Sequence, residues 1–306
     1  MNANHPRLVV SALLVALSLV ASACGSVGDT AVATVGEATL SEEDFEAILE
    51  GTGTENTSVV PSETAARHVR EWIFFESWID LVEQGGTELS VLHLESAREE
   101  YEAARALDPT VPAAGTRYGR IQQRYRAVPH LIADHMIAVA DVSALCSSHL
   151  LVETQAEAIA AIARLDAGED FAALAAEVSI GPSGPTGGDL GCVAPAVFVS
   201  EFVDGAAAVG GAGISDPVQS QFGWHVINVR SFGPPVRGRR QEMTSDELTS
   251  FVFNNYGAEF QQLQTELFNR DISVDPRFGV FDPNTGQVVS GSPATGAVTG
   301  FDSSQN

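Results

Sequence analysis

Two histidines stand in short apolar segments, SSHLLV and WHVINV. Alternation in these segments predicts two β-strands, in which successive side chains point to opposite faces of a sheet. His149 then shares a face with Ser147 and Leu151, whereas Cys146 points to the opposite face. Because a zinc ion needs its ligands on one side, Cys146 and His149 are unsuited to share a metal. His149 and His225 are therefore candidates for a polar pair.

Two other histidines, His130 and His135, are five residues apart on a predicted helix. This spacing is neither the i, i+4 pairing nor the HExxH pattern of a zinc protease, so we expect solvent-exposed or core histidines. The sequence thus predicts no metal site and no cofactor.

The charge balance excludes several classes of chemistry. The 306 residues include 40 acidic and 16 basic side chains, and the net charge is −24. Every basic residue is arginine, and a chain without lysine has neither a Walker-type phosphate loop nor a Schiff-base amine. A nucleic-acid partner is also disfavoured, because phosphate binding draws on surplus cationic groups. The length suggests two domains.

The N-terminus has the pattern of an export signal. Residues 8–20 form an apolar run without a charge, preceded by Arg7 and followed by small residues up to Ala23. Such a run is too short to span a bilayer of about 30 Å as a stable helix. VASAC, which ends at Cys24, resembles a bacterial lipobox, whose cysteine carries the lipid. We expect a lipid-anchored protein on the extracytoplasmic face of the cell membrane; the alternative is an ordinary secretory signal cleaved near Ala23.

In that oxidising compartment two cysteines remain, Cys146 and Cys192. A disulfide between them would close a loop of about 45 residues and contribute about 3 to 4 kcal/mol. The alternatives are two unrelated buried thiols or a Cys/His metal site, which the strand alternation disfavours.

The first half of the chain is predicted to be mostly helical. A strand at 31–35 precedes a helix opened by the capping box of Ser41 and Asp44. Further apolar periodicity predicts helices over 62–82, 92–107 and 116–140. No catalytic motif is found in these segments.

The pattern changes at about residue 142. It predicts a strand at 147–152, followed by two helices at 154–165 and 171–178 and a loop at 181–188. A helix at 199–208 and two strands at 217–220 and 224–229 complete the unit. This order is typical of an α+β unit in which helices cover an antiparallel sheet. A third capping box, Thr244 with Glu247, opens a helix predicted to reach Asn269. Its wide apolar face has no room in the α+β unit, so we expect it to pack on the helical first half.

Three motifs of the middle unit occur in order at compatible spacing: SSHLLV with its following helices, GGDLG, and GISDPVQSQFGWHVINV. Together they resemble the parvulin family of peptidyl-prolyl isomerases over residues 142–232. Residues 30–141 and 241–285 resemble, more weakly, foldase and chaperone lipoproteins of the PrsA/SurA type. The resemblance implies a four-stranded antiparallel sheet covered by helices, inserted in a mostly helical chaperone domain. The expected parts are a signal peptide (1–23), an N-terminal helical domain (24–141), the parvulin unit (142–232), a linker and C-terminal helix (233–285) and a disordered tail (286–306).

The resemblance also implies roles for individual residues. His149 and His225 would meet beneath the substrate, with Ser220 as the third member of the network. They could equally be core histidines that orient each other for stability. The expected proline slot is apolar and is formed by Leu190, Phe198 and Phe202, with Phe222 at its rim.

Rotation about an X-Pro bond breaks no covalent bond, so it needs no nucleophile, metal or cofactor. It needs an apolar slot, exclusion of water and polar groups that favour the twisted amide. One position departs from the family: Gly181 stands where parvulins usually have a cysteine or aspartate. Two functions therefore remain open, an isomerase of weak activity acting on unfolded exported polypeptides with X-Pro bonds, and a non-catalytic holdase.

Overall fold

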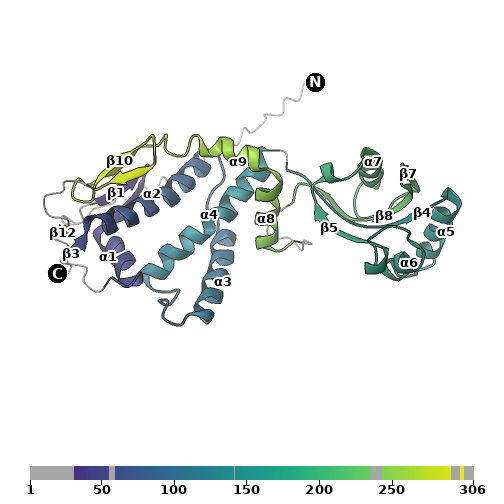
Figure 1. Ribbon diagram of the computed structural model, residues 1–306, viewed down its shortest axis with the longest axis horizontal. Coiled ribbons are helices and arrows are strands. Elements are labelled where there is room, and N and C mark those ends of the chain that lie inside the picture. Colours follow the sequence, from purple (N-terminus) through teal and green to yellow (C-terminus); the bar gives the residue numbers. More distant parts are fainter. Residues whose placement is uncertain (1–30, 55–58, 141, 236–242, 291–296, 300–306) are drawn as a thin grey trace, which may run out of the picture. The chain divides into compact units, whose positions relative to one another are not determined.

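A computed structural model describes residues 31–54, 59–140, 142–235, 243–290 and 297–299 (Figure 1). The expected signal peptide and Cys24 lie outside these residues. None of the helices in the described ranges is both long and apolar enough to cross a membrane.

The helical part begins with a hairpin. Strand β1 (Ala31–Val35) turns at Gly36, whose φ of 53° suits glycine, and pairs with β2 (Ala38–Ser41). On its other side β1 pairs with β9 (Ile272–Val274), so residues from opposite ends of the chain share one sheet. Helix α1 (Glu42–Gly51) follows, and the Ser41 hydroxyl accepts the Asp44 N–H, which is one of the two hydrogen bonds of the predicted capping box.

Three helices form most of this part: α2 (Ser62–Gln84), α3 (Val91–Leu107) and α4 (Arg117–Val139). Their buried residues include Trp78, Leu131 and Met136. Helix α8 (Ser245–Asn255) adds Phe251 and Val252 to the same core, as the wide apolar face of this segment suggested. The chain thus returns to its first helices after the middle unit.

The single C-terminal helix predicted from 244 to 269 is wrong. The chain forms α8 and then α9 (Gly257–Gln264), which are separated by Tyr256 at φ −125° and ψ 37°. The neighbours Asn255 and Gly257 are weak helix formers, so a break there costs little. The break lets Phe260 stack on Trp78, with ring centroids 5.3 Å apart.

The tail predicted to be disordered from residue 286 contains two short strands. Strand β10 (Val280–Asp282) pairs with β11 (Gln287–Val289), and β12 (Ala297–Thr299) pairs with β3 (Val59–Pro61). Val288 and Val298 are buried, so apolar contacts hold these strands where composition alone suggested none.

The middle unit (residues 142–232) is an antiparallel sheet, which confirms the α+β class. Its strands are β4 (Ala144–Val152), β5 (Asp189–Val193), β6 (Gly213–Ile214), β7 (Val218–Ser220) and β8 (Gly223–Gly233). The order is β5-β4-β8-β6, and β7 also pairs with β8. There are five strands rather than the expected four, because the edge beside β8 is interrupted between β6 and β7, where Pro217 has no N–H to donate.

Helices cover both faces of this sheet (Figure 1). Helices α5 (Gln155–Asp166) and α6 (Phe171–Val178) pack on the face that carries Leu150 and Val226. Helix α7 (Ser200–Ala208) packs on the opposite face, which carries Leu145 and Ile227. A disulfide joins Cys146 of β4 to Cys192 of β5, directly opposite each other in the ladder.

Candidate active site

The two histidines predicted to form a polar pair meet on the α7 face of the sheet. His149 lies on β4 and His225 on β8, and the antiparallel register places His225 opposite Leu151. The two Nδ1 atoms are 3.1 Å apart, and the rings lie within 19° of parallel. Both residues are buried, with exposed fractions of 9% and 4%. One Nδ1 therefore donates a hydrogen bond to the other.

Ser220 extends this pair. Its Oγ lies 2.7 Å from His225 Nε2 and accepts the Phe222 N–H at 3.1 Å. If Ser220 donates its one proton to His225 Nε2, then His225 Nδ1 donates to His149 Nδ1, and His149 Nε2 keeps a proton of its own. In that arrangement the chain of hydrogen bonds ends on an N–H of His149.

The surroundings keep both imidazoles neutral at pH 7. The pKa of His149 is lowered to about 4, mainly by burial and to a smaller extent by the nearby His225. Burial also lowers the pKa of His225. The pair can therefore offer directed hydrogen bonds to a substrate but carries no charge.

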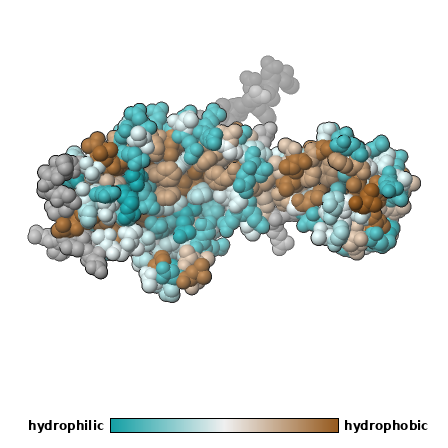
Figure 2. All heavy atoms as spheres, in the orientation of Figure 1, coloured by the Kyte–Doolittle hydropathy of each residue, from teal (hydrophilic) through white to brown (hydrophobic). Residues whose placement is uncertain are grey.

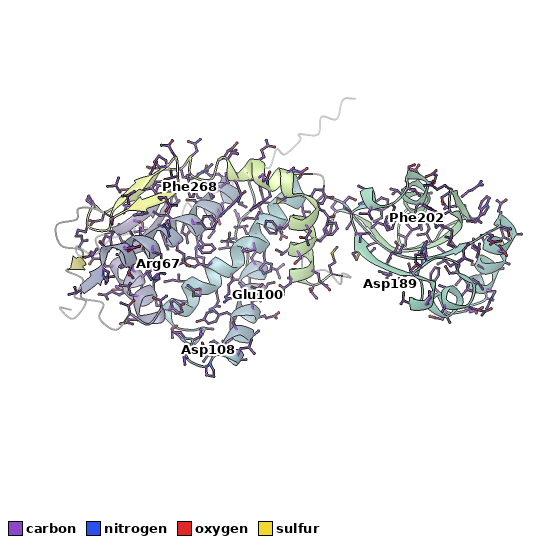
Figure 3. The ribbon with its side chains drawn as sticks, in the orientation of Figure 1. Arg67, Glu100, Asp108, Asp189, Phe202 and Phe268 are labelled. Carbon is purple, nitrogen blue, oxygen red and sulfur yellow. A yellow bond between two sulfur atoms is a disulfide. The ribbon has the colours of Figure 1, made fainter. Side chains whose placement is uncertain are left out.

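Aromatic side chains close the site on the α7 side. The buried Phe202, labelled in Figure 3, lies with its ring nearly perpendicular to both imidazoles, and its ring centroid is 5.6 Å from that of His149 and 5.4 Å from that of His225. Phe198 stacks on Phe202 at 4.6 Å between ring centroids. These contacts make an apolar wall directly beside the polar pair.

The two remaining candidates for the slot lie further out. Leu190 of β5 packs against the same apolar cluster as Phe198. Phe222 lies in the turn between β7 and β8, with 60% of its side chain exposed, and reaches Ser220 only through its backbone N–H. An exposed aromatic beside the site is the expected position for a rim residue.

Gly181 lies against the pair. A Cβ added to it would be 3.6 Å from His149 Nε2 and 3.4 Å from Leu151 Cβ. A side chain at this position would therefore reach the outer nitrogen of His149. Glycine itself contributes no polar side chain to that space, which the Ser179 hydroxyl borders at 3.4 Å from the added Cβ.

Ser179 is a site residue that the sequence interpretation missed. Its Oγ accepts the N–H of Leu151 at 3.0 Å and of Gly181 at 3.2 Å, and it bounds the space beside Gly181. Its position at the end of α6, two residues before Gly181, was the signal available in the sequence. With two donors on its oxygen, its own proton is left to point elsewhere.

The site contains no metal-binding constellation. Within the described ranges, the one group of three His, Cys, Asp or Glu residues that could hold a metal ion lies in the helical part. The chemistry open to the histidine site is thus hydrogen bonding to a ligand that packs on Phe198 and Phe202.

Residues 136–231 match the family model described as "Rotamase: PPIC-type PPIASE domain". Among curated proteins, the foldase protein PrsA of Geobacillus sp. (strain WCH70) is 44% identical over 84 residues, which cover 27% of this chain and only 30% of that protein. Foldase protein PrsA 4 of Bacillus cereus is 28% identical over 293 residues, covering 90% of this chain and 96% of that protein. Among solved structures, the parvulin of Nitrosopumilus maritimus is 35% identical, covers 29% of this chain and 98% of its own, and gives a TM-score of 0.28.

Acid should destabilise the middle unit through the histidine pair. An unfolded histidine titrates near pH 6.5, whereas folded His149 takes up a proton only near pH 4. Between these values the unfolded state binds more protons, so the free energy of unfolding falls as the pH is lowered, by up to about 3 kcal/mol. Urea unfolding at pH 7.5, 6 and 5 measures this loss. The variant His149→Gln lacks the titrating group and should lose less stability over this range; an equal loss would remove His149 as the cause.

Proposed function

Since residues 136–231 form a PPIC-type peptidyl-prolyl isomerase domain, we propose that this chain is a foldase that speeds cis–trans isomerisation of X-Pro bonds in unfolded exported polypeptides. The observation that carries the proposal is the hydrogen-bonded chain of Ser220, His225 and His149, which lies against the edge of Phe202. An X-Pro bond has a polar amide next to the apolar proline ring. The polar histidine pair next to the apolar phenylalanine wall is complementary to these two groups.

The reaction places two demands on this site. Resonance makes rotation about the amide cost about 18 to 20 kcal/mol, and water stabilises the planar form. A proline ring packed on Phe198 and Phe202 would bring its amide beside the imidazoles and away from water. When the amide twists, its nitrogen regains a lone pair that can accept a hydrogen bond from the N–H of His149 Nε2. The planar amide has no such lone pair, so the site binds the twisted form more strongly than the planar form.

Neutral histidines suit this task. The depressed pKa of His149, about 4, keeps the pair uncharged, so the apolar wall beside it is not disturbed by a buried charge. Gly181 removes the third polar group that could act on the amide. We therefore expect a modest rate acceleration, and the alternative function, a holdase that binds without turnover, is favoured by the same glycine.

The sequence before residue 31 adds a proposal about location. The apolar run 8–20 and the VASAC segment support anchoring through a lipid on Cys24, outside the cytoplasm. The disulfide of Cys146 and Cys192 is consistent with an oxidising compartment. A net charge of −24 would repel acidic lipid headgroups and favour basic or neutral clients.

A protease-coupled peptide assay on the full chain tests the isomerase function. The protein should accelerate cis-to-trans conversion, and Phe198→Ala should lower kcat/KM about fivefold or more, because a lost aromatic contact is worth about 1 kcal/mol or more. The matched control is Phe74→Ala, because Phe74 is an exposed phenylalanine of α2. This variant should leave kcat/KM unchanged. Suppression of client aggregation without any acceleration would establish the holdase instead.

Gly181→Asp should raise the isomerase activity. A carboxyl group there lies beside His149 Nε2 and supplies the third polar group that glycine lacks, and one added hydrogen bond to the bound substrate corresponds to roughly a tenfold gain in kcat/KM. Gly181→Ala is the control, because its methyl group meets nothing closer than 3.4 Å and adds no polar atom. If both variants have the same kcat/KM, a missing polar group at 181 does not limit the rate.

The mass of the intact protein tests the anchor and the disulfide together. We expect a chain that begins at Cys24 and carries acyl chains, and that gains two hydrogen atoms on reduction. The variant Cys24→Ser should lose the lipid mass and leave the membrane fraction. An unmodified Cys24 in the mature protein would contradict the anchor.

A further inference from the structure

A second constellation of ligand-type side chains lies in the helical part, apart from the histidine pair. Glu100 of α3, His130 of α4 and Asp246 of α8 each offer one possible ligand atom, and these atoms lie within 4.8 Å of one another. His130 is buried, with 2% of its surface exposed, whereas the two carboxylates reach solvent. Figure 2 shows hydrophilic residues gathered over α3 and α8, where Figure 3 labels Glu100.

The direction of the His130 ring is set by the residue behind it. Thr249 Oγ1 lies 2.8 Å from His130 Nδ1 and donates its one proton to the Ser245 carbonyl at 2.9 Å. The Thr249 oxygen must then accept, so His130 Nδ1 carries the donating N–H. A backing hydrogen bond of this kind orients metal-binding histidines in proteins.

The other ring nitrogen faces two acceptors. Nε2 of His130 lies 2.5 Å from Glu100 Oε1 and 4.0 Å from Asp246 Oδ1. The shorter contact is a hydrogen bond, so a proton lies between His130 and Glu100. A metal ion bound to Nε2 would replace this proton, and Glu100 would move outward to give metal bonds of about 2.0 to 2.2 Å.

Imidazole nitrogen with two carboxylate oxygens is a donor set that suits divalent transition metals better than magnesium or calcium, which prefer oxygen alone. Glu100 and Asp246 have 31% and 70% of their side chains exposed, so both can move by the small distance that metal bonds of about 2.0 to 2.2 Å require. An open depression beside them, lined by Ser96 and Glu99 among others, leaves room for a water ligand.

One nearby charge opposes a cation. Arg126 lines the same depression, but its guanidinium carbon lies over the Tyr101 ring, 5.9 Å from the ring centroid. Among the described residues that line the depression, three carboxylates, those of Glu99, Glu100 and Asp246, stand against this one arginine. The net charge of these described lining residues is therefore negative.

We propose that Glu100, His130 and Asp246 bind one divalent transition metal ion, with Zn²⁺ as the representative. The ion would join α8, which follows the middle unit in the chain, to α3 and α4, which precede it. Because the unfolded chain does not hold these three residues together, binding would stabilise the helical part.

The test is metal binding by the full chain without an affinity tag, which could itself bind metal. After treatment with a chelator, titration calorimetry with Zn²⁺ should give one site per chain, and the Tm should rise by several degrees. Asp246→Asn and Glu100→Gln should each lower the affinity at least about tenfold. Both positions are partly exposed, so these variants should fold. The matched control is Glu99→Gln, because Glu99 lines the same depression. This variant should bind Zn²⁺ with the affinity of the unaltered protein.

Three results would overturn the proposal. The first is the absence of stoichiometric Zn²⁺ binding, which would mean that His130 and Glu100 are joined only by a hydrogen bond. The second is unchanged affinity in the double variant with Asp246→Asn and Glu100→Gln. The third is equal affinity for Zn²⁺ and Mg²⁺, which would indicate a diffuse acidic surface without the histidine as a ligand.

Discussion

The antiparallel pairing of β4 with β8 is the interaction on which the site depends. It joins segments 76 residues apart and brings His149 to hydrogen-bonding distance of His225. A slip of one residue in this register would turn one histidine to the α5 and α6 face and separate the pair. The disulfide fastens β5 to the other edge of β4, so the strand that carries His149 is held from both sides.

Burial gives this pair its chemical character. Desolvation lowers the pKa of both imidazoles, so the site offers directed hydrogen bonds beside an aromatic wall. Such a site suits a reaction that twists a bond without breaking one. The space at Gly181 shows where the arrangement lacks a polar group, and Ser179 is the nearest hydroxyl to that space.

The helical part depends on contacts between the two ends of the chain. Strand β9 completes the sheet begun by β1, and α8 shares a core with α2 and α4. The Glu100, His130 and Asp246 cluster lies at this same junction of early and late helices. A cation there would act where the chain after the middle unit rejoins the chain before it.

The sequence by itself determined most of the local elements and three polar residues of the site, His149, Ser220 and His225, but not Ser179. Capping boxes and apolar periodicity act over three or four residues, so helices α1 to α7 could be predicted from short windows. Strand alternation likewise determined that His149 and Cys146 face opposite ways, and the three motifs identified the middle unit.

Only the tertiary structure decided which distant groups meet. Three contacts join residues that are 76 to more than 200 positions apart. They are the hydrogen bond between His149 and His225, the pairing of β1 with β9, and the approach of Asp246 to His130. The break at Tyr256 and the strands of the tail also follow from packing, through Phe260 on Trp78 and the burial of Val288. Spacing along a chain carries no record of such contacts, because their free energy arises only when the folded core brings the partners together and removes water from between them.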